Sequence, residues 1–132
     1  AISCHVNLET GKLAFANAGH PPLIIIHADC SAEIVNTRGR LISDYIPANC
    51  EDIEVQLHDN DIIVLYTDGI IEERSGDELF GEERFIDILK SRCLAPAGEL
   101  CNSVYNALIE FKGDAMLDDD FTILVMRFRK KR

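Results

Sequence analysis

The sequence predicts an α+β fold in which antiparallel strands come first and a pair of helices follows. Runs of alternating or continuous apolar residues fill the first half of the chain, which is typical of strands. Apolar residues with helical spacing appear only between positions 81 and 111. A last apolar run at 121–128 follows them, so strands and helices do not alternate as parallel βαβ units require.

The strand predictions rest on side-chain alternation and on turn residues. A first strand at the start of the chain and a second over 12–18 are predicted to form a hairpin, because the turn between them contains Gly11. Pro21 and Pro22 then interrupt the pattern, since proline donates no ladder hydrogen bond. Further strands are predicted at 23–27, 34–35, 52–58 and 62–66. The last of these is apolar on both faces, which predicts a central strand.

Two helices are predicted, at 81–93 and from Pro96 to about 111. Each has one apolar face, and each face needs a partner to cover it. The short link through Pro96 favours an antiparallel pair on one face of a sheet. The two apolar stripes consist of Phe85 and Leu89, and of Leu100, Val104 and Leu108.

Composition excludes several classes of function. The net charge of −10 argues against nucleic-acid binding, because phosphate backbones repel carboxylates, and the basic end at 127–132 is interpreted as a solvated terminus. No secretory signal is visible and no apolar run could span a membrane, so we expect no membrane contact by this segment. The five cysteines are odd in number and lack C-x-x-C spacing. This predicts reduced thiols in the core, as in a cytoplasmic protein, with neither a disulfide framework nor a zinc site.

Two acidic segments could carry chemistry. Asp68 lies in a T-D-G sequence directly after the central strand, and three adjacent aspartates, 118–120, precede the last strand. Adjacent carboxylates repel one another, and a hard divalent cation such as Mg²⁺ or Mn²⁺ would remove that repulsion. The alternative is structural, because aspartate side chains in turns commonly accept hydrogen bonds from nearby backbone N–H groups.

Other interpretations of these residues fit less well. An aspartyl-phosphate mechanism of the haloacid-dehalogenase type needs an aspartate where Tyr66 stands, and an EF-hand needs ligands at alternate positions. His20 is interpreted as a loop histidine fixed by its neighbours, since no serine or cysteine nucleophile is near it in sequence. The other histidines, His5, His27 and His58, are predicted to face solvent from strands.

Four motifs occur in a defined order along the chain. They are N-A-G-H-P-P-L at 17–23, L-Y-T-D-G-I-I-E at 65–72, F-G-E-E-R-F at 80–85 and D-D-F-T-I-L-V at 119–125. This series resembles the C-terminal portion of the bacterial SpoIIE/RsbU-type phosphatases of the PPM (protein phosphatase 2C-like) superfamily. The resemblance extends from about residue 6 to residue 129, and four ordered motifs are far more specific than any one of them.

The resemblance implies an αββα sandwich, with two antiparallel sheets flanked by helix pairs, here incomplete at the N-terminus. Residues 1–132 would form the C-terminal portion of one phosphatase domain. It also implies a binuclear Mn²⁺ or Mg²⁺ centre, with Asp68 and Asp119 as ligands and with Glu72 and Asp120 beside them; Asp120 is the alternative ligand. We therefore expect the Asp68 and Asp119 carboxylates to lie within roughly 10 Å of each other.

The implied activity is hydrolysis of phosphoserine or phosphothreonine on a regulatory protein, which in this family is often an anti-sigma-factor antagonist. A metal-activated water would be the nucleophile, so no catalytic side chain is assigned. The family's G-D-x-x-D-type and D-x-S-G-H-G-type motifs do not occur here, and residues 40–47 depart from its G-x-P-L-G turn.

Because those motifs supply a bridging aspartate in the family, the chain alone is expected to hydrolyse almost nothing. The alternatives are an inactive partner-binding module and an unrelated acidic β-rich fold. Sheet edges left uncovered would also favour a homodimer.

Overall fold

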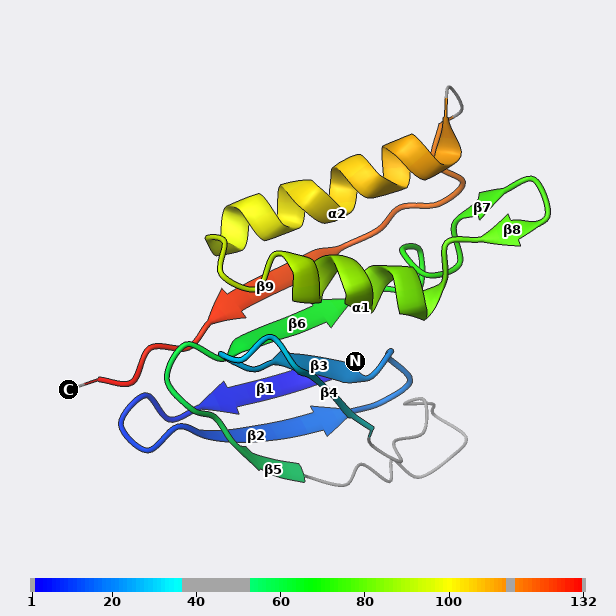
Figure 1. The fold of residues 1–132 in the computed structure, drawn as a ribbon. Coiled ribbons are helices and arrows are strands. Elements are labelled where there is room, and N and C mark those ends of the chain that lie inside the picture. The colour runs from blue at the N-terminus through cyan, green and yellow to red at the C-terminus, as the bar shows by residue number, and fades with distance from the viewer. Residues whose placement is uncertain (1, 37–52, 114–115, 132) are drawn as a thin grey trace, which may run out of the picture.

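Two stacked sheets and a helix pair make up the computed structural model, which describes residues 2–36, 53–113 and 116–131 (Figure 1). The first sheet contains β1 (Ile2–Val6), β2 (Lys12–Asn17) and β5 (Ile53–Gln56) in the order β1-β2-β5, all antiparallel. The predicted hairpin at Gly11 is confirmed. Gly11 has φ 77°, and an added Cβ would lie 2.5 Å from the Leu57 carbonyl oxygen, so the turn requires glycine.

The second sheet has four antiparallel strands in the order β4-β3-β6-β9. They are β3 (Leu23–Ile26), β4 (Ala32–Val35), β6 (Ile62–Tyr66) and β9 (Ile123–Arg127). The prediction that 62–66 is central is confirmed, because β6 pairs with β3 on one side and with β9 on the other.

The helices α1 (Gly81–Ser91) and α2 (Ala97–Lys112) run antiparallel over the outer face of the four-stranded sheet (Figure 1). Their predicted apolar stripes are buried, so the predicted packing is confirmed. A short hairpin of β7 (Arg74–Ser75) and β8 (Glu78–Leu79) was not predicted, because two-residue strands have no measurable periodicity. Neither helix, within the part of the chain described, is long and apolar enough to cross a membrane.

Strand β3 is apolar at every position because it separates two cores. Ile24 and Ile26 belong to the core between the sheet and the helices, whereas Leu23 and Ile25 belong to the core between the two sheets. All four side chains are fully buried. The first core also contains the helix stripes, and the second contains Leu13 and other apolar residues of the three-stranded sheet. The α+β sandwich class predicted from the sequence is thus confirmed, with one helix pair among the described residues.

The prediction that all cysteines are reduced is wrong for Cys30 and Cys93, which form a disulfide with their Cα atoms 5.5 Å apart. The bond joins the β3–β4 turn to the end of α1. Its partners are 63 residues apart, and no local spacing marks such a pair. Cys4 and Cys101 are free, and burial raises the pKa of both thiols. Cys50 and residues 40–47, where the sequence departs from the family's G-x-P-L-G turn, lie outside the described residues.

The prediction of a solvent-facing strand histidine is wrong for His27. Strand β3 ends at Ile26, and the His27 ring lies half-buried in the following turn between Asp61 and Glu33. Burial lowers the pKa of His27, but the hydrogen bonds to Glu33 and Asp61 outweigh it, so the net pKa is raised. His5 and His58 are exposed as predicted.

Candidate metal centre

The two acidic loops lie at the same edge of the four-stranded sheet. Strands β6 and β9 are antiparallel, so the loop that leaves β6 meets the loop that enters β9. The Thr67 N–H donates to the Thr122 carbonyl oxygen (3.0 Å), and the Thr122 N–H donates to Thr67 Oγ1 (2.8 Å). Residues 55 positions apart in sequence thereby bring the T-D-G loop beside Asp118–Asp120.

Gly69 is the point of closest approach between these loops. A Cβ added to it would lie 2.5 Å from the Asp120 carbonyl oxygen and 3.3 Å from Phe121 Cβ. The Glu72 N–H donates to the Asp68 carbonyl oxygen (2.9 Å) and closes the turn around the glycine. Glycine is required here because two backbones touch.

The candidate ligands Asp68 and Asp119 are both exposed to solvent. Asp119 Oδ1 accepts a hydrogen bond from the Asp120 N–H (2.8 Å). This is the kind of local turn hydrogen bond expected if the aspartate has a structural role instead of binding a metal. Asp119 also lines a cavity of about 100 Å³ together with Gly69, Glu72, Glu73 and Asp118. The structure thus brings the two loops together, while the assignment of Asp68 and Asp119 as metal ligands stays a prediction.

A buried ion pair supports the second loop. Glu73 is 2% exposed, and its carboxylate accepts the Asp118 N–H and lies 2.8 Å from Lys112 Nζ. Lys112 Nζ also lies 2.6 Å from Asp118 Oδ1 and donates to the Arg74 carbonyl oxygen (2.9 Å). Hydrogen bonds to Asp118 and then to Glu73 raise the pKa of Lys112, and the ammonium group in turn lowers the pKa of Asp118.

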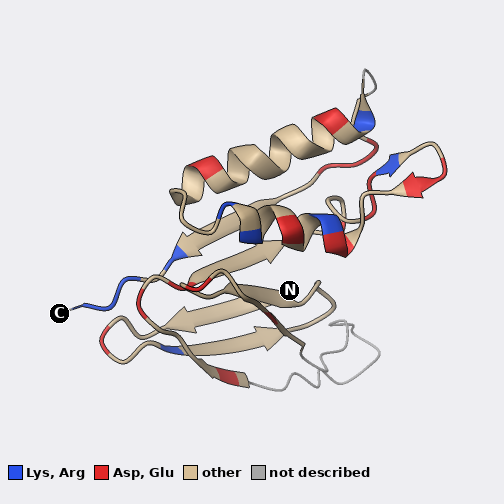
Figure 2. Ribbon diagram, viewed as in Figure 1, with Lys and Arg blue, Asp and Glu red and all other residues tan. Residues whose placement is uncertain are grey.

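This ion pair was not predicted from the sequence. Glu73 directly follows Glu72, and nothing in the local pattern shows which of them is buried. Lys112 lies in the last turn of α2, where a basic residue is favourable for the helix dipole alone. Figure 2 shows the result in space: acidic residues on both loop segments gather at the basic end of α2.

Tyr66 and His20 flank the same edge. Burial, followed by the charges of Glu82 and Asp68, raises the pKa of Tyr66 to about 12, so the phenol stays neutral near pH 7. Its buried hydroxyl has no hydrogen-bond partner among the described residues. The expectation that neighbours fix His20 is confirmed: Asn17 Oδ1 accepts the His20 N–H (2.9 Å), and Asn17 Nδ2 donates to the His20 carbonyl oxygen (2.9 Å).

The donor set of the two loops fits a hard divalent cation, because exposed carboxylates with access to water are the ligands that Mg²⁺ and Mn²⁺ prefer. Among the described residues, both loops carry exposed carboxylates at this edge, and Glu82 of α1 lies near enough to raise the pKa of Tyr66. Within the described ranges, three or more potential ligand atoms lie within 4.8 Å of one another at His27, His58 and Asp61. That group lies at the opposite end of β6 and is separate from the acidic loops.

Comparison with known proteins connects this chain to a family. Residues 1–129 match the family model described as Stage II sporulation protein E (SpoIIE). The phosphoserine phosphatase RsbU of Bacillus subtilis is 24% identical over 122 residues, which are 92% of this chain and 36% of RsbU. The structure of the RsbU and RsbW domains of Rv1364c from Mycobacterium tuberculosis is similar with a TM-score of 0.83 and 28% identity, over 99% of this chain and 36% of that one.

The fold is also that of the phosphatase domain of the Bacillus subtilis cell fate determinant SpoIIE, solved from Mn-presoaked crystals. The TM-score is 0.78 at 19% identity, over all of this chain and 57% of that one. The chain therefore spans about a third to little more than half the length of these relatives. The family model covers nearly the whole of it, and the two-sheet architecture agrees. The chain belongs to the SpoIIE family.

Proposed function

We propose that this chain supplies one side of the active site of a metal-dependent serine/threonine protein phosphatase. The observation that carries the proposal is the contact of the two acidic loops at Gly69 and Asp120, which sets Asp68 and Asp119 at one edge of the sandwich. The name of the relative RsbU, phosphoserine phosphatase, supports the same reaction.

In this proposal Asp68 and Asp119 hold Mn²⁺ or Mg²⁺, with Asp120 as the alternative to Asp119. The bound metal would supply an activated water and offset the charge of the phosphoryl oxygens. The chain's own residues position these ligands. Glu73 and Lys112 hold the Asp118–Asp120 loop against α2, and neutral Tyr66 packs on Phe85 with ring centroids 4.7 Å apart.

The proposed domain is larger than this chain, with residues 1–132 as its C-terminal portion. A binuclear centre needs more ligands than the two aspartates assigned here, so a bridging ligand from elsewhere in the protein is part of the proposal. The small number of assigned metal ligands in this chain also supports a second candidate function, an inactive module that binds its partner protein without hydrolysis.

The proposed substrate is a phosphorylated regulatory protein, with an anti-sigma-factor antagonist as the specific candidate. The Mycobacterium tuberculosis structure joins RsbU and RsbW domains in one protein, which supports a regulatory context for the relatives. We propose a cytoplasmic location because regulatory proteins of this class would be its substrates. The sequence argument for that location assumed reduced thiols, and the Cys30–Cys93 disulfide removes this support for those two residues.

The test is hydrolysis of a phosphoserine protein in millimolar Mn²⁺ by the whole protein that carries this chain. Asp68→Asn and Asp119→Asn should each lower kcat/KM by at least about 100-fold, because each removes a ligand charge. Asp77→Asn, an exposed aspartate of the β7–β8 hairpin, is the matched control and should change kcat/KM less than about twofold.

The outcomes separate the two candidates. Activity that survives both substitutions would contradict the metal assignment. Absence of activity in the unmodified protein, together with tight binding of the phosphoprotein, would favour the binding module.

A further inference from the structure

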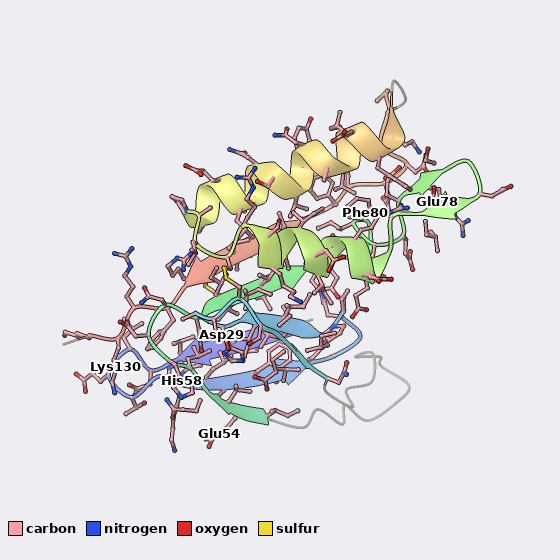
Figure 3. The ribbon with its side chains drawn as sticks, viewed as in Figure 1. Asp29, Glu54, His58, Glu78, Phe80 and Lys130 are labelled. Atoms are coloured by element: carbon pink, nitrogen blue, oxygen red, sulfur yellow. A yellow bond between two sulfur atoms is a disulfide. The ribbon has the colours of Figure 1, made fainter. Side chains whose placement is uncertain are left out.

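A second group of metal-ligating side chains lies at the other end of β6. His27 directly follows β3, while His58 and Asp61 belong to the turn between β5 and β6. Figure 3 places His58 at the end of the molecule near Lys130, far from Phe80 and Glu78. At about 3.3 Å per residue of strand, Asp61 is roughly 20 Å from Asp68. The group is therefore independent of the acidic loops.

The spacing of these side chains matches ligands that share one ion. His27 Nδ1 lies 3.3 Å from Asp61 Oδ1, and His58 Nδ1 lies 3.8 Å from Asp61 Oδ2. The His27–Asp61 hydrogen bond is therefore long, because charge-assisted hydrogen bonds to carboxylates are usually about 2.7–2.9 Å. Ligand atoms bound tetrahedrally at about 2.0–2.1 Å lie about 3.4 Å apart. The His27–Asp61 distance is close to that value, and the His58–Asp61 distance exceeds it by about 0.4 Å.

The outer partners of the group are also compatible with a metal site. His27 Nε2 lies 3.0 Å from Glu33 Oε2, so the ring nitrogen facing away from Asp61 has a carboxylate partner. Coordinating histidines commonly donate their second N–H to a carboxylate in this way, which fixes the tautomer. Asp61 is 1% exposed, and its Oδ2 accepts the His58 N–H (2.8 Å), which leaves Oδ1 directed at His27.

The backbone around His27 is rigidly held. The His27 N–H donates to the Ser31 carbonyl oxygen (2.9 Å), and the Cys30 N–H donates to the His27 carbonyl oxygen (2.8 Å). Asp29 Oδ1 accepts both the N–H and the hydroxyl of Ser31. The disulfide between Cys30 and Cys93 ties this turn to α1. A ligand on such a turn is preorganised, so little ordering entropy would oppose binding.

We propose that His27, His58 and Asp61 form a binding site for a divalent transition-metal ion, with Zn²⁺ as the ion that two imidazoles and one carboxylate favour. The ion would fasten the turn after β5 of one sheet to the end of β3 in the other. Its fourth position faces solvent beside His58, whose side chain is 75% exposed. Without an ion, the same contacts form a salt-bridge network of His27 with Asp61 and Glu33, and this is the alternative that the experiment must separate.

The experiment is calorimetric titration with Zn²⁺ of the whole protein that carries this chain, in an Asp68→Asn/Asp119→Asn/Asp120→Asn background that removes the candidate ligands of the acidic loops. We expect one equivalent to bind with a micromolar or lower dissociation constant. His58→Ala should raise this constant at least about tenfold, and His27→Gln about 100-fold or more, because each removes a ligand. Glu33→Gln should raise it by about tenfold through loss of the second hydrogen bond.

His5→Ala is the matched control, since His5 is an exposed histidine on β1, and it should bind Zn²⁺ as tightly as the parent. Co²⁺ in place of Zn²⁺ should give the intense visible absorption of tetrahedral coordination in the parent and in His5→Ala but not in His58→Ala. Because His58 is exposed, circular dichroism of His58→Ala should be unchanged. Absence of Zn²⁺ binding in the parent overturns the proposal, and so does an affinity that His58→Ala and His27→Gln leave equal to that of His5→Ala.

Discussion

Substitution of Gly69 by alanine tests the contact between the two acidic loops. The new methyl group would lie 2.5 Å from the Asp120 carbonyl oxygen, about 1 Å inside the favourable separation of roughly 3.5 Å. The atom it meets belongs to the backbone, so no side-chain rotation relieves the overlap. Overpacking of this kind costs about 1–3 kcal/mol, and relieving the strain requires the Gly69 turn and the Asp120 backbone to move apart.

The assays are urea unfolding and Mn²⁺ activation of phosphatase activity, both in the whole protein that carries this chain. We expect Gly69→Ala to lower the free energy of unfolding by about 1–3 kcal/mol. A shift of about 1 Å in one ligand loop should also raise the Mn²⁺ concentration for half-maximal activity, by at least about tenfold, since such misplacement commonly costs up to about 100-fold.

Gly98→Ala is the matched control. Gly98 lies in α2, and a Cβ added there would have no neighbour within 4 Å. Alanine is the better helix former, so this variant should gain up to about 1 kcal/mol and keep the parent's response to Mn²⁺. If Gly69→Ala behaved like Gly98→Ala in both assays, the loops would not be in contact as described.

Three further predictions concern the support of the site and the core. Lys112→Met should destabilise the protein and weaken Mn²⁺ activation, because it leaves the buried Glu73 carboxylate without its cation. Adding Glu73→Gln should restore part of the stability. A double-mutant cycle in which the two effects are purely additive would show that the pair does not interact. Reduction of the Cys30–Cys93 disulfide should lower the free energy of unfolding by up to about 4 kcal/mol in urea melts, as expected for a loop of 63 residues, whereas a Cys30→Ser variant should be insensitive to reductant; equal sensitivity of both would refute the assignment. Leu108→Ala should cost about 2–5 kcal/mol, because Leu108 is fully buried between α2 and the sheet, whereas Ile109→Ala on the exposed side should cost less than about 1 kcal/mol; similar losses would contradict the orientation of α2.

Much of the fold could be predicted because each long element has its own pattern. The run at 62–66 is apolar on both faces since β6 has a core on either side, and the stripe through Leu100 and Leu108 has the period of a helix packed on one face. The two acidic loops could be predicted as a pair for a related reason. Each adjoins an apolar strand, and antiparallel pairing brings the end of one strand to the start of the other.

What could not be predicted depends on contacts between distant residues. Glu72 and Glu73 are chemically identical neighbours, and the turn around Gly69 points their side chains in different directions. That direction decides which of the two carboxylates is buried against Lys112. The Cys30–Cys93 pair depends on where α1 ends over the β3–β4 turn. His27 looked like one more alternating strand residue, but β3 ends one residue before it. Tertiary packing, which no local pattern records, decides all of these.

The most direct test of the central claim is anomalous diffraction from Mn²⁺-soaked crystals of the protein that carries this chain. We predict an anomalous peak within about 2.3 Å of a carboxylate oxygen of both Asp68 and Asp119, in keeping with the short bonds that hard divalent cations form to oxygen. Asp68→Asn should abolish that peak. A Mn²⁺ peak that contacts neither aspartate, or one that persists unchanged in Asp68→Asn, would contradict the assignment of these two loops as the metal centre.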